Sequence, residues 1–161
     1  MSEQTATPGP IGVDKEEVVL PTKGKLLAID WGEKRIGLAI SDADQRIAHP
    51  LGTLTRRLGR RFPMKQLRVH LDAHGPVGVL VGLPLEESGE EGPNAEKARL
   101  AGDLVRSKSG IPVSFFDERM TTARALQAVR ELGGATRERK KEIDALAATV
   151  LLQTYLDAKR S

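Results

Sequence analysis

The chain has 161 residues, which is the size of one ordinary domain. It contains no cysteine, which excludes disulfides, thiolate zinc sites and cysteine nucleophiles. Its 25 Lys and Arg residues against 22 Asp and Glu residues give a net charge of +3, a mild basic excess that permits a polyanionic partner without requiring one.

The first 23 residues mix proline, glycine and polar residues, and this composition predicts a flexible N-terminal tail at 1–23. The rest, 24–161, is expected to form a single domain. No apolar run approaches the ~20 residues that cross a bilayer, and the N-terminus lacks the basic and apolar regions of a secretion signal. These features predict a cytoplasmic protein with no membrane partner.

Two short strands are predicted to open the domain as a hairpin, at 25–30 and 35–41. The first is a continuous apolar run that ends in Asp30, which is typical of a strand buried on both faces. A third strand at 46–54 completes an antiparallel meander, although Pro50 and Gly52 disfavour a strand there.

Helices and strands alternate in the rest of the chain. Buried strands are predicted at 77–81 and 112–116. Helices are predicted at 63–73, at 94–108 with Asn94 as N-cap, from Thr121 or Thr122 to Leu132, and at 141–158. The order indicates an α/β fold with a mixed central sheet, an antiparallel meander followed by parallel strands, flanked by helices.

Helical spacing also predicts which side chains are buried. The helix at 63–73 is expected to bury Met64, Leu67, Val69 and Leu71. The last helix is expected to bury one broad face made of Ile143, Leu146, Ala147, Val150, Leu151 and Tyr155.

Three acidic residues interrupt or end apolar elements: Asp30, Glu118 and Asp144. Burying an unpaired carboxylate costs several kcal/mol, and a divalent cation is one source of the compensating charge. Ligands of α/β sheets gather outside the carboxyl ends of strands, where Asp30 and Glu118 are expected. Each residue also has a simpler reading: a turn for Asp30, a solvated strand end for Glu118, and a favourable helix-dipole position for Asp144.

Several sequence blocks resemble the YqgF/RuvX family of RNase H-like nucleases, also described as Holliday-junction-resolvase-like or pre-16S rRNA processing nucleases. The blocks occur in family order over about residues 25–158, and together they are highly specific. They are 28–42 (AIDWGEKRIGLAISD), 81–85 (VGLPL), 92–99 (GPNAEKAR), 117–122 (DERMTT), 143–148 (IDALAA) and 151–156 (LLQTYL).

This resemblance implies an RNase H-like fold and a metal-dependent endonuclease that hydrolyses phosphodiester bonds in structured nucleic acid, in pre-16S rRNA processing or Holliday junction resolution. It implies that Asp30, Glu118 and Asp144 are both the catalytic residues and the ligands of Mg²⁺ or Mn²⁺, with two ions expected. Oxygen ligands suit such hard ions, and two of them about 3.5 to 4 Å apart can activate water and stabilise the leaving oxygen.

Two features complicate the match. Family members often have Asn or Met followed by Asp-Gly after the 81–85 block, whereas this chain has Glu86, Glu87, Glu90 and Glu91 in that loop. Such a loop repels phosphate if it lies on the substrate path. In addition, Asp117 stands next to Glu118 and is an alternative metal ligand, so the choice of Glu118 rests on the resemblance.

Basic residues indicate where nucleic acid binds. The strongest cluster places six positive charges within thirteen residues: Arg56, Arg57, Arg60, Arg61, Lys65 and Arg68. Its alternative interpretation is a solvated surface. Arg35 and Arg119 lie close in sequence to the proposed acids, where they either neutralise the scissile phosphate or pair with the carboxylates and orient them.

Two other functions remain open. One is a non-catalytic nucleic-acid-binding module with the same RNase H-like fold, against which the presence of all three acids argues. The other is an ATPase or sugar kinase of the actin-like group, which requires two lobes and therefore a longer chain. The sequence leaves open RNA or DNA as substrate, and a monomer or a homodimer as the assembly.

Overall fold

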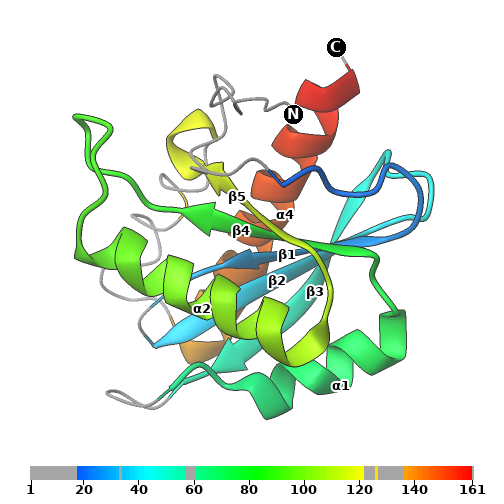
Figure 1. Cartoon of the computed structure of the whole chain (residues 1–161). Coiled ribbons are helices and arrows are strands. Elements are labelled where there is room, and N and C mark those ends of the chain that lie inside the picture. The colour runs from blue at the N-terminus through cyan, green and yellow to red at the C-terminus, as the bar shows by residue number, and fades with distance from the viewer. Residues whose placement is uncertain (1–17, 33, 57–60, 122–125, 127–135, 161) are drawn as a thin grey trace.

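The computed structural model describes residues 18–32, 34–56, 61–121, 126 and 136–160. Its five strands are β1 (Leu26–Asp30), β2 (Arg35–Ser41), β3 (Ala48–Thr55), β4 (Gly78–Leu83) and β5 (Val113–Asp117). They form one sheet in the order β3-β2-β1-β4-β5 (Figure 1). The β1–β2 and β2–β3 pairs are antiparallel, and the β1–β4 and β4–β5 pairs are parallel. The expected mixed sheet, an antiparallel meander followed by parallel strands, is confirmed.

The described helices are α1 (Met64–His74), α2 (Pro93–Ser109) and α4 (Arg137–Arg160), with a short 3-10 turn at Glu118–Met120. In Figure 1, α1 and α2 cover one face of the sheet and α4 crosses the other. The helix predicted from Thr121 or Thr122 to Leu132 lies almost wholly outside the described residues. No helix in the described ranges combines the length and the apolar character needed to cross a bilayer.

The sheet has a separate hydrophobic core on each face. Leu27 and Ile29 of β1 belong to the core that includes α1 and α2, whereas Leu26 and Ala28 belong to the core beneath α4. This alternation follows from the two-residue period of a strand. It places Asp30, two residues after Ala28, on the α4 face of the sheet.

The third strand accommodates both residues that disfavour strand structure. β3 lies at the edge of the sheet, where strands tolerate proline. Its pairing with β2 shifts between Leu38↔Gly52 and Ala39↔Pro50, so one extra residue, Leu51, bulges from the ladder. The strand begins at Ala48 and ends at Thr55, rather than running from 46 to 54.

Two predictions about α1 and α2 are wrong. Val69 is 66% exposed, while Leu67 and Leu71 are buried, because Leu67 and Leu71 are one turn apart and Val69, halfway between them, points away. The N-cap of α2 is Gly92, with Pro93 in the first turn, rather than Asn94.

The buried face of α4 is rotated about the helix axis relative to the predicted face. Ala147 and Leu151 are buried as expected, but Leu146 is 46% exposed, and the buried set also contains Asp144. The burial of Asp144 was predicted from its apolar neighbours, whereas the exposure of Leu146 was not. The observed face includes Asp144 because the backbone of α4 rests against Gly37 of β2 at this residue.

The folded part of the chain begins before the predicted boundary at residue 24. Leu20 is only 3% exposed and packs in the core beneath α4. The Gln45 side chain donates hydrogen bonds to the carbonyl oxygens of Pro21 and Gly24, both at 2.9 Å. Residues 18–23 therefore lie against the domain, and the rest of the predicted tail, 1–17, lies outside the described residues.

Candidate active site

Asp30 lies at the carboxyl end of β1, in the middle of the sheet, with only 2% of its surface exposed. Its partner on β2 is Gly37. On the other side of β1, the β4 register pairs Ile29 with Val81, so Gly82 comes level with Asp30. A glycine thus flanks Asp30 on each neighbouring strand, which clears the α4 face around its side chain.

Gly37 allows the second carboxylate to approach. A Cβ atom added to Gly37 would overlap the backbone carbonyl of Asp144 on α4. The helix backbone therefore rests directly on β2 beside Asp30, and Asp144 is 1% exposed. Only glycine permits a helix to lie this close to a strand at that point.

Gly82 makes room for the third carboxylate. Glu118 follows β5 directly, begins the 3-10 turn and is 1% exposed. A Cβ atom added to Gly82 would lie 3.2 Å from Oε2 of Glu118 and 2.9 Å from a methyl group of Leu151. The Glu118 side chain thus folds back over β4 toward the position of Asp30.

The three predicted catalytic acids are therefore buried on the same face and at the same end of the sheet. Within the described residues, no three acidic or histidine side chains are already arranged to hold a metal ion. The donor set nevertheless fits a hard divalent cation, because all of its members are carboxylates. Concentrating buried negative charge at one place also favours a bound cation.

Arg35 pairs with one of these acids. Its Nε atom donates a hydrogen bond of 2.7 Å to Oδ2 of Asp144. Arg35 lies two residues before Gly37 on β2, so both face α4. Of the two roles that the sequence left open for Arg35, the structure shows the pairing with a carboxylate.

Asp117 is committed to Arg119. Its buried carboxylate accepts hydrogen bonds from the backbone N, the Nε and the Nη2 of Arg119, at 2.9, 3.1 and 2.8 Å. The hydrogen bond to Asp117 raises the pKa of Arg119 above its ordinary value. Asp117 therefore caps the 3-10 turn and anchors Arg119. Asp117 and Glu118 point to opposite faces of the sheet, because the side chains of adjacent strand residues alternate in direction.

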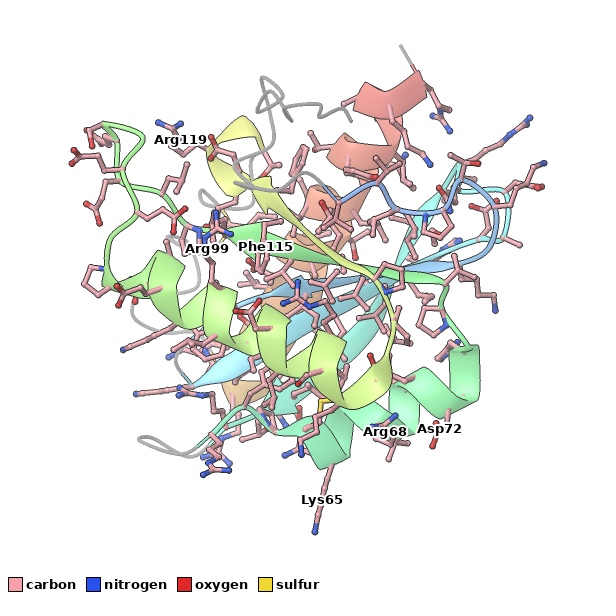
Figure 2. All side chains as sticks on the ribbon, viewed as in Figure 1. Lys65, Arg68, Asp72, Arg99, Phe115 and Arg119 are labelled. Atoms are coloured by element: carbon pink, nitrogen blue, oxygen red, sulfur yellow. The ribbon has the colours of Figure 1, made fainter. Side chains whose placement is uncertain are left out.

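Three residues of the predicted basic cluster, Arg56, Lys65 and Arg68, lie on the α1 and α2 side of the sheet, whereas the three acids lie on the α4 side. Arg56 stacks on Trp31, the residue after Asp30, with its guanidinium carbon 4.6 Å from the ring centroid. Lys65 and Arg68 lie on α1, whose Leu67 and Leu71 share a hydrophobic core with Trp31 (Figure 2). Arg61 is exposed, and Arg57 and Arg60 lie outside the described residues.

The sequence reasoning missed two residues that shape the site, Gly37 and Gly82, and one that packs behind it on the other face of the sheet, Trp31. The two glycines stand inside predicted apolar strands, and that position is itself a signal of close backbone approach. Trp31 was considered only as part of a turn. It is 8% exposed and stacks on Phe62 as well as carrying Arg56.

Comparisons with known proteins agree on one family. Residues 24–158 match the sequence model of RuvX, described as Holliday junction resolvase. A Chloroflexus aurantiacus protein named "Putative pre-16S rRNA nuclease" is 46% identical over 136 residues, which are 84% of this chain and 88% of that protein. A protein of the same name from Clostridioides difficile is 35% identical over 84% of this chain and 96% of its own length.

Among solved structures, Thermus thermophilus RuvC in complex with a Holliday junction substrate aligns with a TM-score of 0.49 and 20% sequence identity. The alignment covers 85% of this chain and 96% of that one.

Proposed function

The chain belongs to the RuvX family of Holliday junction resolvases, and from this premise we propose that it is a nuclease that depends on divalent metal ions. Its reaction is the hydrolysis of phosphodiester bonds in structured nucleic acid. The observation that supports this most is the burial of Asp30, Glu118 and Asp144 on one face and at one end of the sheet, around two glycines that leave room for them.

In this proposal the three carboxylates hold Mg²⁺ or Mn²⁺, with two ions expected. Ions held there would supply Lewis-acid chemistry, lowering the pKa of water and stabilising the leaving oxygen. The protein supplies the geometry. Gly37 and Gly82 set how closely Asp144 and Glu118 approach Asp30, and Arg35 orients the Asp144 carboxylate.

The substrate proposal covers two nucleic acids that share a phosphodiester backbone. The curated relatives are named for pre-16S rRNA, and the family description names the Holliday junction. Both are folded or branched, and hydrolysis at three carboxylates with metal requires no base-specific contact. We propose that the protein acts in the cytoplasm, as a monomer on an RNA end or as a two-fold homodimer on a junction.

The direct test incubates the full chain with a synthetic four-way junction and with an rRNA precursor, in Mg²⁺, in Mn²⁺ or in EDTA. Cleavage is expected only with metal, and Asp30→Asn is expected to abolish it. Asp72→Asn is the matched control, because it removes the same charge from α1, on the other side of the sheet.

Two outcomes contradict the proposal. Equal cleavage by Asp30→Asn and by the wild type indicates a contaminating nuclease. Binding that survives EDTA and the substitution, without cleavage of either substrate, favours a non-catalytic binding module.

A further inference from the structure

The loop after β4 carries four exposed acidic side chains beside the proposed active site. Residues 86–91, here called the acidic loop, contain Glu86, Glu87, Glu90 and Glu91. The loop leaves the sheet just after Leu83, which pairs with Asp117 of β5. It therefore begins next to the strand end that carries Glu118.

Arg119 fastens the first half of this loop. Its Nη1 atom donates to the backbone carbonyl oxygens of Glu87 and Glu86, at 3.2 and 3.5 Å, while Asp117 holds the other side of the guanidinium. The guanidinium also lies 3.5 Å from the position of a Cβ at Gly89. Since Arg119 directly follows Glu118, the loop is tied to the residue next to a proposed metal ligand.

Arg99 of α2 fastens the end of the loop. It binds the Glu91 carboxylate through Nε and Nη2, at 2.8 and 2.7 Å, and its guanidinium carbon lies 4.9 Å from the Phe115 ring centroid. Figure 2 shows Arg99 next to Phe115, with Arg119 above them. Bidentate arginine–carboxylate pairs fix geometry as well as charge.

The loop also has internal structure. The backbone N–H of Gly89 donates to the Glu86 carbonyl, and that of Glu86 donates to the Glu90 carbonyl, at 2.8 and 2.9 Å. Gly89 has φ +92°, a conformation that favours glycine. The backbone that carries Glu87 and Glu90 is therefore held in place at the β4–β5 side of the site.

We propose that the acidic loop determines substrate specificity, by excluding a continuous phosphate backbone from the β4–β5 side of the active site. This inference rests on the proposed nuclease function and names its substrate class: a strand that ends or turns sharply at the cleaved bond. Of the two roles that the sequence left open for Arg119, the structure shows the pairing with a carboxylate, that of Asp117, and in this proposal the pair positions the loop.

Short-range electrostatic repulsion supports the proposed preference for a branched or terminal strand over a continuous duplex. The Debye length at physiological salt is about 8 Å, so fixed carboxylates beside the site repel phosphates that pass over them. A continuous duplex places phosphates on both sides of the cleaved bond. A branched or terminal strand can leave by the β2–β3 side, where Arg35 lies. The loop therefore disfavours the duplex more than the branched substrate.

The test compares binding of a four-way junction and of a continuous duplex of equal length, made as DNA and as RNA, in EDTA so that no metal-dependent cleavage occurs. The variant is Glu87→Gln with Glu90→Gln. The matched control is Asp72→Asn with Asp103→Asn, which removes the same charge from the outer surfaces of α1 and α2. Arg119→Gln, which releases the loop while leaving its carboxylates, is the second variant.

The wild type is expected to prefer the junction. Loop neutralisation is expected to improve duplex binding by about 1.5- to 5-fold per charge removed, to improve junction binding less, and thus to narrow the preference. Arg119→Gln is also expected to reduce the ratio of junction affinity to duplex affinity, whereas the control variant leaves this ratio unchanged. Equal gains on both substrates, an unchanged ratio, or equal wild-type affinities overturn the inference.

The two proposals fail separately. A narrowed preference without metal-dependent cleavage by the wild type contradicts the nuclease function alone. Intact cleavage with an unchanged preference contradicts the role of the loop alone.

Discussion

The Nε atom of Arg35 lies 2.7 Å from Oδ2 of Asp144, and the hydrogen bond between them joins residues 109 positions apart in the sequence. Asp144 is almost fully buried, whereas Arg35 remains 16% exposed. A charge-assisted bond of this length fixes the direction of the acceptor. The pair therefore holds a carboxylate of α4 over the sheet beside Asp30.

Replacing Arg35 tests whether it positions Asp144 or binds substrate. Arg35→Gln is expected to lower kcat at least tenfold with little change in KM, because Asp144 loses its orientation, and Arg35→Lys is expected to restore part of the rate. Arg35→Gln also leaves a buried charge without this partner, at a cost of up to about 3 kcal/mol in the free energy of unfolding. Steady-state kinetics and denaturant unfolding measure both effects.

Arg106→Gln is the control, since that arginine lies exposed on α2 and pairs with Asp103 on its own helix. A raised KM with unchanged kcat in Arg35→Gln would show that Arg35 binds phosphate instead.

Gly37→Ala is expected to damage stability and activity together. The new methyl group overlaps the Asp144 carbonyl, so α4 must move, and such overpacking costs about 1–3 kcal/mol. The displaced Asp144 is expected to reduce cleavage at least tenfold.

Gly110→Ala is the control. Nothing lies within 4 Å of its Cβ position, and only its φ of +75° disfavours alanine. This variant is expected to lose about 1 kcal/mol of unfolding free energy and to keep full activity. Equal activity in both variants would argue against the packing role of Gly37.

The residues that the sequence placed correctly are those whose local context carries the information. Asp30 ends a continuous apolar run, and that pattern alone predicts a buried strand with a carboxylate at its end. The inward turn of Asp144 was anticipated from its apolar neighbours, yet the same neighbours led to the wrong burial of Leu146. Helix rotation is set by what the helix packs against, here Gly37 on a strand more than 100 residues earlier.

The long-range hydrogen-bond partners of Arg35 and Arg119 could not be predicted from the sequence for a related reason. Arg35 and Arg119 each have several acids within reach in the unfolded chain, and only the assembled sheet brings Asp144 to one and the acidic loop to the other. The sequence gives composition and spacing, whereas these contacts depend on crossover geometry.

Asp42 provides a test of the hairpin at acidic pH. Its Oδ1 accepts hydrogen bonds from the backbone N–H groups of Ile47 and Arg46, at 3.0 and 2.8 Å, and these bonds lower the pKa of the carboxyl below its usual 3.8. A lowered folded-state pKa means that the ionised form stabilises the fold. This contribution is full above the unfolded pKa and is lost as pH falls through the folded one.

The Asp42→Ala variant is therefore expected to have a lower Tm than the wild type near neutral pH, with the difference shrinking as the pH falls from about 5 to about 2. A constant difference across this range would show that charge at Asp42 does not contribute.

Titration of Mn²⁺ into the full chain, followed by the shift in Tm, tests the central claim most directly. The wild type is expected to gain about 2.7 kcal/mol of unfolding free energy when free Mn²⁺ reaches 100 times its dissociation constant. Asp30→Asn is expected to lose most of this gain, whereas Asp72→Asn retains it. An identical Mn²⁺ response in Asp30→Asn and the wild type, or no response in either, would contradict a metal site built on Asp30, Glu118 and Asp144.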